Sequence, residues 1–199
     1  MTTIAELFPS VYETTLCKRA NIYCSTPITS GKLYADWLKK IDRKYDSSDS
    51  IAQHYIDSHK KEVVELNRQY AQGFVERIRT KTEVPVINPA AMPHIDNWKD
   101  SDWLDFWESV ITTYARFVVF ADGWEYSNGC TYEFLVAQLF NIECFDENLS
   151  PIGLVDGIEL IKTAIIILKE NNGVTIGLER NLALLKPLNL HSIYPKLNP

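Results

Sequence analysis

Apolar positions along the chain fall into two patterns that follow one another. Short runs of apolar residues, closed by turn-forming residues, predict buried strands. Longer stretches that repeat apolar residues every three or four positions predict helices. The predicted strands are residues 20–26, 84–89, 116–121 and 141–145, and the predicted helices are residues 32–45, 51–79, 100–115, 130–140 and 151–173. The remaining C-terminal residues, 174–199, predict irregular or short-helical structure.

The alternation of strands with helices indicates an α/β fold with a parallel sheet. The strands are apolar enough to be covered on both faces, which is typical of such sheets. We therefore predict a three-layer sandwich with a flavodoxin- or Rossmann-like parallel sheet. The chain shows no internal repeat and no low-complexity linker, so we divide it into an N-terminal arm (1–19), an α/β domain (20–145) and a helical C-terminal extension (146–199) packed on the same domain.

Composition and charge narrow the choice of partners. Asp and Glu number 26 against 20 Lys and Arg, which gives a formal net charge of −6. This is opposite to what a surface for nucleic acid polymers needs. The four cysteines lack CxxC spacing and no basic-then-apolar leader is present, so we expect free thiols and a cytoplasmic protein. The most apolar run, residues 158–170, contains Lys162 and is too short to span a bilayer, so no membrane partner is expected.

Two loops that follow predicted strands carry the residues most suited to chemistry. Residues 24–31 (CSTPITSG) and 121–129 (ADGWEYSNG) are rich in hydroxyl groups and glycine, and a helix is predicted after each. In parallel sheets ligands bind beyond the carboxyl ends of the strands, and helix N-termini offer free N–H groups to anions. The loops indicate a small anionic ligand, although such residues are also ordinary in turns. Glu133, in the first turn of the predicted helix 130–140, fits a catalytic carboxylate and equally a residue favoured by the helix dipole.

Three segments together resemble one family. Residues 22–31 (IYCSTPITSG), 84–92 (VPVINPAAM) and 118–137 (VVFADGWEYSNGCTYEFLVA) are similar to the nucleoside 2-deoxyribosyltransferase-like superfamily, which includes deoxyribosyltransferases and nucleoside 5′-monophosphate N-glycosidases. The resemblance spans roughly residues 20–145 and is most specific from GWEYSNG to Glu133. It implies N-glycosidic chemistry on a small-molecule nucleoside or nucleotide, without a cofactor, by a homo-oligomer that is commonly a dimer.

On this resemblance Glu133 falls on the nucleophilic carboxylate and Tyr23 on the tyrosine that orients it. Attack by such a carboxylate on the anomeric carbon divides one difficult displacement into two easier ones. Ser127 falls where transferases carry an aspartate for the sugar 5′-hydroxyl and where monophosphate glycosidases carry a serine for the 5′-phosphate. Because a serine does not repel a phosphate, the resemblance favours a nucleoside 5′-monophosphate. The other residues expected to bind substrate are Ser25, Thr26, Pro27, Thr29, Ser30, Gly123, Trp124, Asn128, Gly129 and Arg116.

One position departs from the family pattern. The superfamily usually has an acidic residue just before the VVF strand, where it can protonate the leaving base, whereas this chain has Arg116. Arginine cannot donate a proton at neutral pH. We therefore expect Asp122 to take the acid role. The alternatives are that Glu125 does so, that the base leaves unassisted, or that the protein binds its ligand without turnover. Trp124 is expected to be an exposed loop aromatic that stacks on the base.

Other motifs leave alternatives open. No metal site is expected, because His54 and His59 are wrongly spaced for two ligands on one helical face. Trp103 and Trp107, at helical spacing, are expected in the core. The apolar stripe Ile158, Ile161, Ile165 and Leu168 suits either self-association or packing on the domain.

Three functions remain open at this point. They are hydrolysis of the N-glycosidic bond of a (deoxy)nucleoside 5′-monophosphate, base exchange by a nucleoside 2-deoxyribosyltransferase, and nucleotide binding without catalysis. The first is the leading hypothesis, because the loop and Glu133 match the family pattern with a serine at position 127. The cation at position 116, which suits the binding of an anion better than protonation of a base, is the feature that favours the third.

Overall fold

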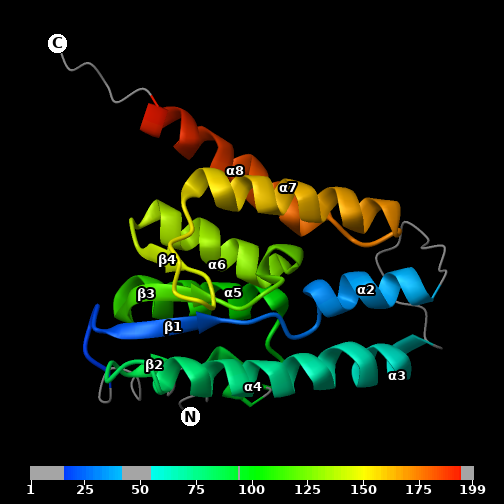
Figure 1. Ribbon diagram of the computed structural model, residues 1–199, viewed down its shortest axis with the longest axis horizontal. Coiled ribbons are helices and arrows are strands. Elements are labelled where there is room, and N and C mark those ends of the chain that lie inside the picture. The colour runs from blue at the N-terminus through cyan, green and yellow to red at the C-terminus, as the bar shows by residue number, and fades with distance from the viewer. Residues whose placement is uncertain (1–15, 42–54, 94, 194–199) are drawn as a thin grey trace.

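The computed structural model describes residues 16–41, 55–93 and 95–193. They form a four-stranded, fully parallel sheet with the strand order β2-β1-β3-β4 (Figure 1). The strands are β1 (Asn21–Ser25), β2 (Val86–Ile87), β3 (Ala115–Phe120) and β4 (Glu143–Phe145). Each lies within or overlaps a predicted strand, and the parallel sheet between helical layers confirms the predicted α/β sandwich.

Helices follow most of the strands, as the hydrophobic pattern predicts. They are α2 (Lys32–Lys40), α3 (Ile56–His59), α4 (Glu65–Arg79), α5 (Asp100–Tyr114), α6 (Asn128–Leu139), α7 (Leu154–Glu170) and α8 (Ile176–Ile193), with a π-helical segment η2 (Lys60–Val64) between α3 and α4 and the short 3-10 turns η3 (Pro89–Ala91) and η4 (Trp124–Tyr126). Most of the predicted N-terminal arm, the end of the first predicted helix and the start of the second lie outside the described residues.

The prediction for the C-terminal residues is wrong, because α8 is one long helix. Gly177 and Pro187 interrupt its sequence and obscure the helical pattern. The buried positions of α8 contact α6 and α7. Tertiary packing therefore stabilises a helix that the local sequence does not predict. The apolar ones among these positions, spaced four and three residues apart, are Leu178, Leu182 and Leu185, and the polar Asn181 is buried beside them.

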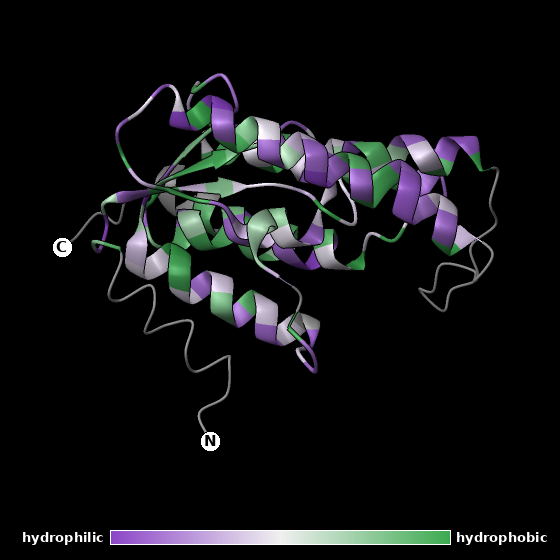
Figure 2. Ribbon diagram, turned by 90° about the horizontal axis from the view of Figure 1, so that it is seen from below, coloured by the Kyte–Doolittle hydropathy of each residue, from purple (hydrophilic) through white to green (hydrophobic). Residues whose placement is uncertain are grey.

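The alternation of side chains along β1 divides the core into two faces. Ile22 and Cys24 point to the side covered by α4, where they pack with Phe74, Val75 and Ile78. Tyr23 points to the opposite side, which α5 and α6 cover (Figure 1). Figure 2 shows hydrophobic strands between helices that turn hydrophilic residues outward. The two sides of β1 therefore have different roles, and Ser25, the polar last residue of the strand, lies on the same side as Tyr23.

The last two helices pack on α6, on the side away from the sheet (Figure 1). The stripe formed by Ile158, Ile161, Ile165 and Leu168 is buried there, so of its two readings the structure supports packing on the domain. Gly157 lets α7 approach closely, since a Cβ at this position would lie 2.3 Å from Cζ of Phe134. In the described part of the chain no helix is long and apolar enough to cross a membrane.

Candidate active site

The carboxyl ends of β1 and β3 mark the place where ligands bind in sheets of this topology. The chain passes from β1 to β2 on one side and reaches β3 on the other side of β1, so the strand order reverses between β1 and β3. Ser25 and Phe120, the last residues of these strands, are paired in register. Both loops identified in the sequence begin here, and the Ala121 N–H donates to the Ser25 carbonyl at 3.0 Å.

Two hydroxyl groups from β1 hold the carboxylate of Glu133. Tyr23 and Ser25 are two residues apart, so both face α6. The Tyr23 hydroxyl donates to Oε1 of Glu133 at 2.6 Å, and the Ser25 hydroxyl donates to Oε2 at 2.5 Å. The bond from Tyr23 has the geometry that the family resemblance implies. Ser25 was expected to contact substrate, and its bond to Glu133 is a role that sequence reasoning missed.

Burial controls the ionisation of Glu133. Only 9% of the residue is exposed. Removal from water raises its pKa to about 7, although the hydrogen bonds from Ser25 and Tyr23 lower it by favouring the carboxylate. Glu133 is thus a carboxyl group that changes its charge near neutral pH, which is the range a catalytic carboxyl group needs.

The raised pKa of Glu133 predicts that this group makes the protein less stable as the pH rises. Its pKa is about 7 in the fold against an ordinary value of 4.5, so between these values the folded protein binds more protons than the unfolded chain. Stability therefore falls across this interval, by roughly 3 kcal/mol in all. Glutamine does not ionise, so Glu133→Gln should gain stability relative to wild type between about pH 5 and about pH 8, as measured by urea unfolding. If the free energy of unfolding of Glu133→Gln differed from that of wild type by the same amount at both pH values, the raised pKa of Glu133 would be contradicted.

Ser127 fixes where α6 begins. Its hydroxyl accepts from the Cys130 N–H at 3.4 Å, so the helix starts at Asn128, two residues before the predicted start. Glu133 therefore lies in the second turn. The prediction that it lies in the first turn is wrong, and with it the alternative that the helix dipole explains its position, since that effect fades after the first turn. The N–H groups in the first turn of an α-helix have no carbonyl acceptor within the helix and are directed toward its N-terminal end. In α6 these groups include those of Asn128 and Gly129.

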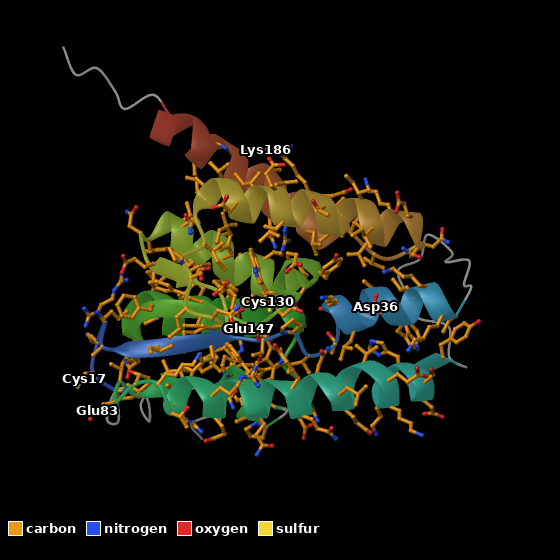
Figure 3. All side chains as sticks on the ribbon, in the orientation of Figure 1. Cys17, Asp36, Glu83, Cys130, Glu147 and Lys186 are labelled. Carbon is orange, nitrogen blue, oxygen red and sulfur yellow. The ribbon has the colours of Figure 1, made fainter. Side chains whose placement is uncertain are left out.

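Cys130 lies in the interior between the sheet and α6, one turn before Glu133 (Figure 3). Burial and the nearby charge of Glu133 both raise the pKa of its thiol. A thiol in this setting stays protonated and unreactive. Cys130 is thus a small buried residue and not a nucleophile.

Two glycines bring the loops of the site together. Gly31 and Gly123 have φ angles of 87° and 77°, which L-residues with side chains rarely adopt. A Cβ on Gly123 would lie 2.6 Å from Cβ of Lys32, and a Cβ on Gly31 would lie 2.6 Å from Cβ of Pro27. Glycine at position 123 thus lets the loop after β3 approach the start of α2, and glycine at position 31 allows the tight turn within the loop after β1.

The loop after β1 is held by side chains from the helices below it. Asn67 of α4 donates to the carbonyls of Ile28 and Ser30 at 3.0 and 2.8 Å, and Nε2 of His59 lies 2.8 Å from the Thr29 carbonyl. The Thr26 hydroxyl is buried at the end of β1 without a hydrogen-bond partner in the described part of the chain. These contacts fix the backbone of the loop before any ligand binds.

Trp124 does not have the exposed position expected of it. Only 4% of the residue is exposed, and its ring lies 4.7 Å from that of Phe120 and 4.8 Å from that of Phe134. The 3-10 turn η4 directs the side chain inward, where it fills space between β3 and α6. The expectation of an exposed aromatic residue is therefore wrong, because hydrophobic burial outweighs loop position here.

The structure does not bring Asp122 and Arg116 to Glu133. Asp122 is exposed and forms an ion pair with Lys32 at 3.1 Å. Arg116 is exposed near the start of β3, at the end of the sheet opposite to Phe120, where its guanidinium lies 4.8 Å from the Phe117 ring. Asn128 turns its carbonyl and amide groups toward α8.

Glu125 is the acidic residue of this loop that resembles a proton donor. It is half-buried, and burial together with the charge of Asp122 raises its pKa. It lies on the wall of a cavity of about 330 Å³ that the loop after β3 shares with residues 146–160. Among the described residues, five carboxylates and no basic side chain line this cavity, so it does not suit a phosphate. They are Asp122, Glu125, Asp146, Glu147 and Asp156.

A row of aromatic residues reaches the site from α5 and the segment just before it, and two of them, Trp103 and Trp107, were predicted to lie in the core. Trp107 contacts Tyr23 edge to face, with ring centroids 5.9 Å apart. Phe106 lies against Trp107 at 4.8 Å, and Trp98 and Trp103 continue the row. All four are only partly buried, so Trp103 and Trp107 are not fully buried core residues. The predicted helical spacing of Trp103 and Trp107 is confirmed. Which of these side chains contacts Tyr23 depends on how α5 packs against β1.

No family model matches this chain, and neither the curated proteins nor the solved structures contain a match to it.

Proposed function

We propose that the protein is an N-glycosidase that cleaves the N-glycosidic bond of a (deoxy)nucleoside 5′-monophosphate. The observation that carries the proposal is the Glu133 carboxylate, buried at the reversal point of the sheet, with one oxygen bonded to Tyr23 and the other to Ser25. A desolvated carboxylate with a fixed orientation is what stabilises an oxocarbenium-like transition state and then forms a bond to the anomeric carbon.

The reaction proceeds in two steps. In the first, a Glu133 oxygen forms a bond to the anomeric carbon, and the bond to the base breaks with its electron pair remaining on the base nitrogen. In the second, water attacks the same carbon and displaces the Glu133 carboxylate, and one proton of the water passes to the carboxylate that protonated the leaving base in the first step. Because the nucleophile must be ionised, the rate should rise with pH through the pKa of Glu133, which is about 7.

Glu125 replaces Asp122 as the residue that protonates the leaving base. The exposed ion pair with Lys32 keeps Asp122 at the surface, whereas burial raises the pKa of Glu125 and so favours its protonated form. A group with a raised pKa can hold a proton until the base departs.

The start of α6 is the proposed site for the 5′-phosphate. Ser127 and the N–H groups of Asn128 and Gly129 precede Glu133 by one to two turns of the same helix. Helix N-termini favour anions, and this one carries no acidic residue in its first turn. The phosphate and the anomeric carbon of one nucleotide would then lie along α6.

A panel of ribo- and deoxyribonucleoside 5′-monophosphates and the matching nucleosides tests the proposal. Chromatography should detect free base from at least one monophosphate without an added acceptor base. In Ser127→Asp the kcat/KM for that monophosphate should fall about tenfold to a hundredfold, because the new carboxylate repels the phosphate, while the value for the nucleoside should not fall. Ser109→Asp, at an exposed position of α5, controls for the added charge alone, and the nucleoside, which lacks the phosphate, controls for the burial of Ser127, which is 5% exposed.

Other outcomes of the same panel assign the alternatives. Product formed only when acceptor base is added would replace hydrolysis by base exchange. Binding of a monophosphate without turnover would indicate a nucleotide-binding protein. If kcat/KM fell equally for the monophosphate and the nucleoside in Ser127→Asp, the proposed phosphate site would be contradicted, but the proposed hydrolysis would not.

A further inference from the structure

The C-terminal helix α8 contacts the first turn of α6 through one buried amide. Asn181 has no exposed surface. Its Nδ2 lies 3.2 Å from the Asn128 carbonyl, 3.3 Å from Oδ1 of Asn128 and 2.9 Å from Oγ1 of Thr131. The Thr131 hydroxyl in turn donates to the Asn128 carbonyl at 3.1 Å. Three residues are thus joined in one small network across a sequence separation of 53 residues.

A glycine lets α8 come this close. A Cβ on Gly177 would lie 2.1 Å from Oδ1 and 2.4 Å from Cγ of Asn128. No side chain at position 177 can share this space with the present position of the Asn128 side chain. Asn128 is therefore held between the backbone of α8 at Gly177 and the amide of Asn181.

The network acts on the phosphate end of the proposed site and not on Glu133. Asn128 is the first residue of α6, directly after Ser127, so its position determines where the N–H groups of the helix start point. Glu133 is fixed from the other side of α6, by Tyr23 and Ser25 of β1. Two separate sets of contacts therefore determine where the phosphate binds and where the nucleophile lies.

We propose that Asn181 is a positioning residue of the active site, through which α8 sets the first turn of α6 for binding of the substrate phosphate. The inference rests on the proposed function for the identity of the ligand, but the positioning itself is measurable without any ligand. It gives the C-terminal region a role in substrate binding by the same chain.

Amide hydrogen exchange of the full-length protein tests the positioning first. In Asn181→Ala, peptides that cover residues 127–131 should exchange about tenfold faster or more than in wild type, since the amide donates hydrogen bonds to two residues of this turn. Peptides from β1 should exchange unchanged. Asn171→Ala is the matched control, because the Asn171 amide donates only within its own helix region, to the Ile167 carbonyl at 2.7 Å. Unchanged exchange at 127–131 in Asn181→Ala would overturn the inference whatever the protein does to nucleotides.

Kinetics then separate positioning from a general loss of structure. With the monophosphate that the panel identifies, Asn181→Ala should raise KM about tenfold, change kcat less than about threefold, and leave the pH at which kcat is half-maximal unchanged. A loss confined to kcat, or a shifted pH profile, would overturn a role in phosphate positioning. If Glu133→Gln keeps full turnover, the proposed function fails, whereas the exchange result still decides the role of Asn181.

A second variant covers the event that Asn181→Ala does not fold. Gly177→Ala leaves Asn181 in place and replaces a helical glycine by a better helix former. Its added methyl group displaces the Asn128 side chain, so it should raise KM in the same direction. Combined with Asn128→Gly, which removes the displaced atoms, it should cause no loss beyond that of Asn128→Gly alone. If the effects of Gly177→Ala and Asn128→Gly simply added in the double variant, position 177 would not act through its contact with the Asn128 side chain.

Discussion

Glu133→Gln is expected to lower kcat/KM for release of free base by about a thousandfold or more. Glutamine keeps the size of the side chain and can still contact Tyr23 and Ser25, but it has no anionic oxygen to form the bond to the anomeric carbon. Loss of a catalytic nucleophile removes most of the rate enhancement of an enzyme. The measurement is chromatographic quantification of base released from the monophosphate identified by the panel, with circular dichroism to establish that the variant is folded.

Tyr23→Phe makes a smaller change at the same site, since it removes one hydrogen bond to Glu133 and keeps the carboxylate. The phenol hydrogen bond lowers the pKa of Glu133, so its removal should raise that pKa and move the rise of kcat with pH to higher pH. Glu108→Gln, which changes a carboxylate on α5 that accepts a hydrogen bond from Tyr132, is the control for loss of a carboxylate elsewhere. Base release in Glu133→Gln at the wild-type rate would remove Glu133 from the mechanism and contradict the proposed function.

Trp124→Ala is expected to lower the free energy of unfolding by about 3–5 kcal/mol, the range for removal of a large buried aromatic side chain. The indole packs between the rings of Phe120 and Phe134 and is almost fully buried, so its removal leaves a cavity between β3 and α6. Urea unfolding monitored by circular dichroism measures the change.

Trp124→Phe separates packing from substrate stacking. Phenylalanine keeps an aromatic ring in the core and should cost less than half as much stability as alanine, and KM should stay near the wild-type value. A fall of less than about 1 kcal/mol in Trp124→Ala, together with a raised KM in both variants, would show instead that the ring faces the substrate. The mutant pair thus tests the correction that the structure makes to the sequence-based prediction.

Much of the fold is visible in the local sequence. Val118, Val119 and Phe120 are apolar and buried because β3 is central and covered on both faces, and the same holds for Ile22, Tyr23 and Cys24 of β1. α7 was predictable because its buried residues repeat at helical spacing and Pro151 and Gly173 bound the segment. α8 was not, because Gly177 and Pro187 carry no helical signal and its stability comes from contacts with α6 and α7.

For the candidate site, the sequence by itself determined the chemical types and the ends of the strands. Hydroxyl groups and glycines after two buried strands indicated loops at one edge of a parallel sheet, and the two-residue period of β1 determined that Tyr23 and Ser25 share a face. A short sequence motif is sufficient to predict these features, because the period of a strand and the residues that form a turn are local properties of the chain.

Only the tertiary structure decided which of these groups meet. The contact of Glu133 with Tyr23 and Ser25 spans 110 and 108 residues and depends on how α6 packs on β1. The burial that raises the pKa of Glu133, the inward position of Trp124, the distance of Arg116 from the site and the bond from Asn181 to Asn128 all follow from that packing. Desolvation and long-range contact depend on elements distant in the chain, and no local pattern of residues encodes them.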